Sequence, residues 1–78
     1  VKMLEAYLLI VARKGRSMEL ANKLMKMHFI KRIDITQGEY DVIAEVNAKN
    51  EGKLDNIVHE NIRKLRDVKL VSPLIVRN

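Results

Sequence analysis

The chain has 78 residues, no cysteine and a formal net charge of +5. This length allows one domain with a modest core, and the lack of cysteine excludes disulfide bonds. Small domains then gain stability from a metal or from oligomerisation, and two histidines, His28 and His59, are too few for a histidine-based metal site. The sequence has no apolar run of the ~20 residues that span a bilayer, and its start lacks a signal peptide. We therefore expect a cytoplasmic oligomer that does not enter membranes.

The first half of the chain predicts a strand, a helix and a second strand. Residues 4–11 predict a strand, because they are apolar without a break from residue 6 onward, which is typical of a buried strand. Ser17 is a candidate cap for the helix that follows. Met18, Ala21, Leu24 and Met25 recur at helical spacing in this helix, and Leu20 and Met27 widen the apolar stripe. Ile33 and Ile35 then alternate with polar residues, which predicts a strand with one solvated face.

The second half repeats this order after a turn at residues 37–39, where Gly38 is suited to a positive φ. Residues 42–47 alternate as a third strand, and residues 50–52 open a second helix. Asn61 is the single polar member of that helix's apolar stripe, which otherwise contains Leu54, Ile57, Val58, Ile62 and Leu65. Residues 68–76 form the last strand, and Pro73 places it at a sheet edge because proline cannot donate to a ladder.

The order of elements is therefore β-α-β-β-α-β, an α+β ferredoxin-like sandwich. Right-handed crossovers predict a four-stranded antiparallel sheet of order 4-1-3-2 with two helices on one face. The first strand is apolar on both sides. The last strand is predicted to place Val68, Leu70, Leu74 and Val76 on one side and Val71 and Ile75 on the other. Because the helices cover one face only, the second apolar face predicts a homodimer interface.

Candidates for catalysis are few, and we expect no enzyme. Glu39 and Asp41 are two residues apart across a turn and could form an acid–base pair, but turns are commonly rich in acidic residues. The sequence has no phosphate loop, metal-ligand spacing or nucleophile motif, so no catalytic residue, cofactor or metal is assigned. The alternative function is a basic RNA-binding module of the same fold. Such modules stack bases on aromatic residues of the central strands, where this chain has only Tyr7 and Tyr40.

Residues 36–41, which read Thr-Gln-Gly-Glu-Tyr-Asp, and the strand Val-Ile-Ala-Glu-Val after them carry a family resemblance. This context resembles the effector-binding domain, or RAM domain, of the leucine-responsive and AsnC-type regulators. The resemblance covers nearly the whole chain, including residues 6–11, 20–27 and 62–68. Family members often read Leu-Pro-Gly-Val where this chain reads Leu65-Arg66-Asp67-Val68, which changes the rigidity of that turn.

The resemblance implies a function in regulation. Regulators of this family carry an N-terminal helix-turn-helix domain, whereas residues 1–78 are expected to form a single RAM-like domain that does not bind DNA directly. Family domains dimerise through their sheets and assemble into rings, with an amino-acid effector bound where dimers meet. This chain would then modulate full-length AsnC-type regulators, or serve as a sensor for another partner.

The matching family positions predict a ligand site. From the turn we expect Gly38, Glu39, Tyr40 and Asp41 to bind the effector. A glycine turn presents backbone N–H groups to a carboxylate, and Asp41 is the nearest charged acceptor for an ammonium group. The further family positions that respond to effector are Asn61, Ile75 and Val76, although the last two are also suited to plain packing.

Overall fold

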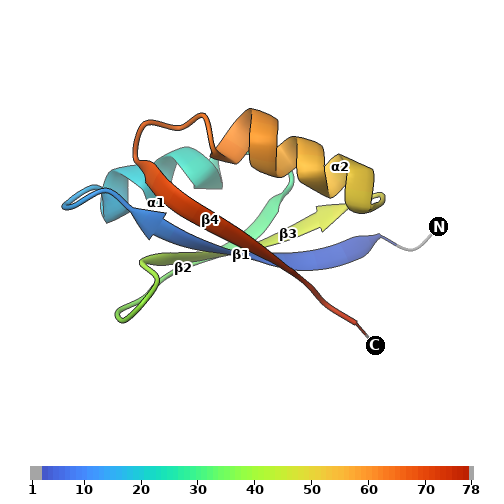
Figure 1. Cartoon of the computed structure of the whole chain (residues 1–78), viewed down its shortest axis with the longest axis horizontal. Coiled ribbons are helices and arrows are strands. Elements are labelled where there is room, and N and C mark those ends of the chain that lie inside the picture. Colours follow the sequence, from blue (N-terminus) through green and yellow to red (C-terminus); the bar gives the residue numbers. More distant parts are fainter. Residues whose placement is uncertain (1–2, 78) are drawn as a thin grey trace.

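The computed structural model describes residues 3–77. Its elements in chain order are β1 (Leu4–Ala12), α1 (Ser17–Met25), β2 (Ile30–Ile35), β3 (Val42–Ala48), α2 (Glu51–Asn56), the π-helical segment η1 (Ile57–Ile62) and β4 (Val68–Ile75). The strands form one antiparallel sheet of order β2-β3-β1-β4, and both helices lie on the same side of it (Figure 1). The predicted ferredoxin-like fold, including its strand order, is confirmed.

The edge position of β4 is also confirmed. Pro73 lies opposite Leu8 of β1, and β4 has no other strand neighbour. A proline at an edge costs no ladder hydrogen bond on the side that faces solvent.

Within residues 3–77, no helix is both long and apolar enough to cross a bilayer.

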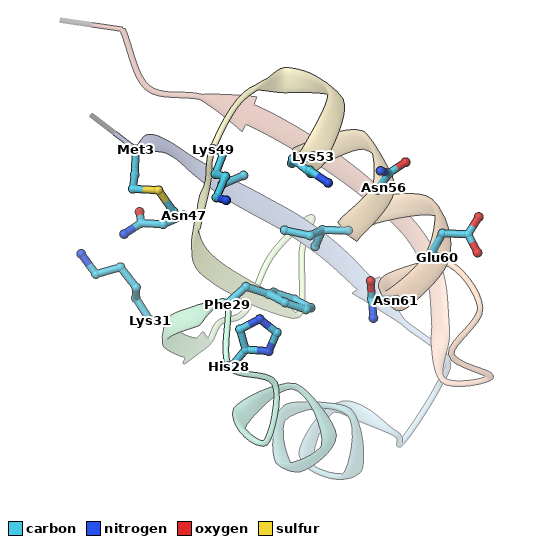
Figure 2. A pocket seen from close by; sticks show the side chains of 12 residues that line it. Met3, His28, Phe29, Lys31, Asn47, Lys49, Lys53, Asn56, Glu60 and Asn61 are labelled. Carbon is cyan, nitrogen blue, oxygen red and sulfur yellow. The ribbon is translucent and has the colours of Figure 1, made fainter. Parts of the chain in front are cut away.

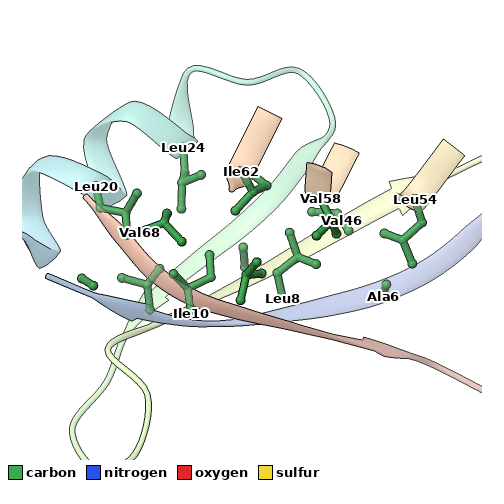
Figure 3. Packing of buried hydrophobic residues seen from close by; sticks show 14 of the residues in the cluster. Ala6, Leu8, Ile10, Leu20, Leu24, Val46, Leu54, Val58, Ile62 and Val68 are labelled. Carbon is green, nitrogen blue, oxygen red and sulfur yellow. The ribbon is translucent and has the colours of Figure 1, made fainter. Parts of the chain in front are cut away.

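The core fills the space between the sheet and the two helices (Figure 3). β1 and β3 turn every second side chain toward the helices, and all of these are buried except Leu4 at the start of β1, which is partly buried. Leu20 and Leu24 of α1, which are one turn apart, are fully buried against them, together with Leu54 and Ile62 of the second helix. The apolar stripe of α1 therefore centres on Leu20 and Leu24. Met18 and Met25, which the sequence placed on that stripe, are exposed.

The helix ends differ from expectation in one respect. The cap of α1 is Arg16, which makes no side-chain cap hydrogen bond, and Ser17 is already the first helical residue. The second helix begins as predicted, because the Asn50 side chain accepts a hydrogen bond from the Lys53 N–H at 2.9 Å. It then widens into η1, where the Arg63 N–H donates to the Val58 carbonyl five residues earlier at 2.8 Å.

A β-bulge changes the facing of β4. The register of β4 on β1 shifts between Val11 and Ala12, so that Leu70 lies opposite Val11 while Val68 lies opposite Ala12. The bulge turns Val68 toward the helices, where it is buried beside Val71. The prediction that Val68 shares a face with Leu70 is therefore wrong, because strict alternation does not allow for the extra residue.

The outer face of the sheet, opposite the helices, has two halves. The strand registers place five apolar side chains on β1 and β4, which we call the apolar half: Tyr7, Leu9, Val11, Leu70 and Leu74. On the β2–β3 side they place three charged residues, which we call the charged half: Arg32, Asp34 and Glu45. Arg32 and Asp34 pair at 3.3 Å. The apolar outer face expected for the first and last strands is thus found on β1 and β4. β2 is solvated on that face, as its alternation predicts, and β3 contributes both Ile43 and Glu45 to it.

Candidate functional site

The turn between β2 and β3 is closed by its own hydrogen bonds. The Thr36 N–H donates to the Asp41 carbonyl, and the Thr36 hydroxyl donates to the Tyr40 carbonyl, both at 2.8 Å. Gly38 has φ of 119°, in the region that only glycine adopts without strain, as the sequence predicts. Gly38 and Glu39 are exposed, and Tyr40 and Asp41 are partly buried.

Asp41 joins this turn to the central strand β1. Its Oδ2 accepts a hydrogen bond from the Ala12 N–H at 2.8 Å, and its own N–H donates to the Ile10 carbonyl at 2.9 Å. One carboxylate oxygen is therefore committed to the fold. The Asp41 carboxylate has a structural role besides any role in binding a ligand.

The remaining predicted site residues lie elsewhere in the molecule. The turn projects from the sheet on the side away from the helices, whereas Asn61 is on η1 in the helix layer (Figure 1). Ile75 lies opposite Ala6 of β1, four residues from Ile10, or about 13 Å along the strand. The adjacent Val76 donates its N–H to the Glu5 carbonyl at 2.9 Å. One protomer does not bring the seven residues together, and their joint role stays a prediction.

Asn61 instead lines a groove on the helix side of the molecule, with a volume of about 680 Å³. The groove lies between the second helix and the segment that joins α1 to β2 (Figure 2). Its walls include His28 and Phe29 from that segment, Lys31 of β2, residues 47–49 at the end of β3, and side chains of α2 and η1. Sequence reasoning did not find this groove, because its residues come from distant parts of the chain and share no spacing.

A buried carboxylate was also missed. The Asp67 side chain is 3% exposed and accepts hydrogen bonds from Arg16 Nε at 3.0 Å and Lys23 Nζ at 3.1 Å. These bonds, first from Arg16 and then from Lys23, hold the pKa of Asp67 below its ordinary value. Asp67, the residue before β4, is thereby linked to both ends of α1. It stands at the position where the sequence departs from the Leu-Pro-Gly-Val pattern. The contact explains why an acid is accommodated there.

The described residues support neither a metal site nor an RNA-binding face. Within 3–77, no group of three or more His, Asp or Glu side chains is placed to share a metal ion. Tyr7 is the one aromatic residue that the strand registers place on the outer sheet face of this range. A base-stacking platform, which the RNA-binding alternative requires, is not formed by that face.

Comparison with known proteins identifies the family. No family model matches the chain. The structure called FFRP-DM1 is 32% identical, superposes with a TM-score of 0.92, and is matched over 96% of this chain and 100% of its own. The chain belongs to the AsnC-type, or feast/famine, family of regulatory domains. The hypothetical protein PHS023 from Pyrococcus horikoshii agrees, with 32% identity, a TM-score of 0.89, and coverage of 97% of this chain and 92% of its own.

Longer regulators contain the same domain. The transcriptional regulator FL11 from Pyrococcus furiosus is 34% identical over 53 residues, which are 68% of this chain and 35% of that protein. The chain thus spans about a third of this curated relative. AsnC from E. coli shares the fold, with a TM-score of 0.90 and 16% identity over 96% of this chain and 51% of its own.

Membership in this family confirms the resemblance seen in the sequence. AsnC-type domains are regulatory and not enzymatic, which agrees with the expectation of no catalytic site. Domains of the family oligomerise and bind amino acids. A regulator from Neisseria meningitidis was solved with L-methionine, as was a feast or famine regulatory protein from M. tuberculosis. Each is 17% identical to this chain over 96% of its length and half of their own, with TM-scores of 0.88 and 0.82, so they share its fold.

Proposed function

We propose that this chain is a non-catalytic effector domain that dimerises through its sheet, binds an amino acid and modulates AsnC-type regulators. The observation that carries the proposal is the likeness to FFRP-DM1 over the whole of that chain, together with an apolar half of the outer sheet face that no part of residues 3–77 covers. We expect it to act in the cytoplasm, where such regulators work, without contacting DNA itself.

The apolar half supports the homodimer. Leu70 is 63% exposed and Leu74 is 52% exposed on the edge strand, beside Tyr7 at 40% on β1. Contiguous exposed side chains of this size are unusual on a monomer and mark an interface. A two-fold axis through this half buries the same residues of both copies, and the charged half then lies at the rim, where charged residues are tolerated.

The separation of the predicted ligand residues supports a site that is shared between dimers. Gly38 offers backbone N–H groups to a carboxylate, and the second oxygen of Asp41 is available to an ammonium group. Asn61, Ile75 and Val76 are too distant to join them within one protomer, so a neighbouring dimer of a ring would supply them. An effector bound there stabilises the assembly that forms its site, and thereby shifts the oligomer population.

Isothermal titration with each of the twenty amino acids tests this function, beginning with L-methionine because two family members were solved with it. The informative variant is Asp41→Asn, since the amide oxygen preserves the hydrogen bond from Ala12 while removing the negative charge. Asp41→Ala would leave that N–H unpaired and weaken the fold.

We expect heat of binding with at least one amino acid, at least a tenfold loss of affinity in Asp41→Asn, and no change in the control Asp34→Asn. Asp34 is an exposed carboxylate outside the turn. Silence of the wild-type protein toward all twenty amino acids would refute the effector role.

A further inference from the structure

The groove on the helix side has an apolar floor. Phe29 and Ile57 are partly buried and pack against the core, and Ala48 between them is almost fully buried. In Figure 2, Phe29 and His28 project from the segment after α1, while Asn56, Glu60 and Asn61 are carried by the second helix. Its volume of about 680 Å³ is within the range of small-molecule sites. The floor suits the apolar body of a small ligand.

The polar rim of the groove carries an excess of positive charge. Lys31, Lys49 and Lys53 line it, and neither Lys49 nor Lys53 forms an ion pair with any residue in 3–77. Lys31 makes only a long contact, 3.8 Å, with Glu45. The one acid of the rim, Glu60, is paired with Lys64 at 2.8 Å, and this hydrogen bond lowers the pKa of Glu60. The unpaired lysines therefore favour an anion.

One further observation singles this groove out. Ile57, Glu60 and Asn61 line the groove from η1, and π-helical segments occur frequently at functional sites.

We infer that this groove binds small carboxylates that carry an apolar side chain. Lys49 and Lys53 receive the carboxylate, and Phe29 and Ile57 receive the side chain. The groove and the turn at Gly38 are separate places in the fold, and of the seven predicted effector residues the groove includes Asn61 alone.

Titration of the full ¹⁵N-labelled chain, followed by two-dimensional NMR, tests this inference. L-3-phenyllactate is the probe, and L-phenylalanine distinguishes an amino-acid source of the same chemistry from a hydroxy-acid source. Phenyllactamide removes the charge and lactate removes the ring, whereas 3-phenylpropanoate keeps both. We expect phenyllactate or phenylalanine to shift the amide signals of Ala48, Lys53 and Asn61. The amide and lactate should bind at least fivefold more weakly, and 3-phenylpropanoate should bind about as tightly as phenyllactate.

The double variant Lys49→Gln/Lys53→Gln should weaken binding of phenyllactate at least fivefold. The matched control Lys14→Gln/Lys26→Gln removes the same charge from exposed lysines outside the groove and should bind as the wild type does. Equal loss in both double variants, equal binding of the uncharged amide, or signal shifts confined to the outer sheet face would overturn the inference. Loss of amino-acid binding in Asp41→Asn with phenyllactate binding intact would separate the two sites.

Discussion

The two faces of the sheet are built from the same strands but differ in how far their side chains are buried. On the helix side, Leu8 and Ile10 of β1 and Val42 and Val46 of β3 are fully buried. On the outer side, Tyr7 of β1 is 40% exposed and Leu9 is only partly buried, although these side chains are also large and largely apolar. The difference shows that apolar content alone does not decide burial within one chain. Burial depends on whether a second layer is available, and for the outer face we propose that a second copy of the chain supplies that layer.

The first prediction concerns the closed face. Leu8→Ala removes three buried heavy atoms (Cγ, Cδ1 and Cδ2) from the centre of the core and should lower the free energy of unfolding by about 2–5 kcal/mol. Urea denaturation at several protein concentrations measures it, and the loss should persist at every concentration because the cavity lies within one protomer. A loss below about 1 kcal/mol would mean that the core around β1 repacks freely.

The second prediction concerns the apolar half of the outer face. Leu70→Asp places a charge where two copies are expected to meet, and should weaken dimerisation at least tenfold while the protomer stays folded. Met18→Asp is the matched control, because Met18 is 61% exposed, close to the 63% of Leu70, but lies on α1. Sedimentation velocity measures both. A dimer that survives Leu70→Asp but is lost in Met18→Asp would move the interface to the helix side.

The third prediction compares a buried carboxylate with an exposed one. Asp67→Asn turns an amide N–H toward Arg16 or Lys23 and should lower the melting temperature by about 5–10 °C at pH 7. Glu60→Gln, which removes an exposed ion pair with Lys64, should change it little.

The Asp67 contribution should also depend on pH with a defined sign. Because its folded-state pKa lies below the ordinary value of about 3.9, the contribution is complete above that value. It is lost as the pH falls through the lower folded-state pKa. The melting temperatures of wild type and Asp67→Asn should therefore converge in acid. A difference that stays constant from pH 7 to pH 2 would exclude the ionised carboxylate as the cause.

The fourth and smallest effect is expected in the charged half of the outer face. Arg32→Ala breaks an exposed ion pair with Asp34 and should change the free energy of unfolding by no more than about 0.5 kcal/mol. The mass in solution should stay the same if the apolar half alone carries the interface. Dissociation of the dimer in Arg32→Ala would show instead that both halves are needed.

Much of the fold could be predicted because its determinants are local. Alternation in residues 42–47, the apolar run at 4–11 and the edge signal of Pro73 are each contained in a few neighbouring residues. The errors arose where distant parts decide the outcome. Arg16, whose side chain bonds to the distant Asp67, takes the cap position of α1 instead of Ser17. The bulge at Val11–Ala12 turns the Val68 side chain to the opposite face of the sheet from the one predicted. The register of two paired strands depends on both of them, so it cannot be predicted from either segment alone.

The candidate sites divide in the same way. The turn at Gly38 could be proposed as a site from the sequence because its glycine and acidic residues lie within four positions of one another. The positive φ of Gly38 is confirmed. The groove depends on Phe29, Lys49 and Asn61, which only the packing of the second helix brings together. Asp67 gave a partial signal, as an acid in the turn at 65–68, but its partners Arg16 and Lys23 are more than forty residues away.

The measurement that tests the account most directly is the mass of the wild-type chain in solution, by light scattering across a wide range of concentrations. One chain has a mass of 9.0 kDa. Pairing through the apolar half predicts a mass of twice this value or an even multiple of it at micromolar concentration, reduced to a single chain by Leu70→Asp. A mass of 9.0 kDa for the wild type at every concentration would contradict the account.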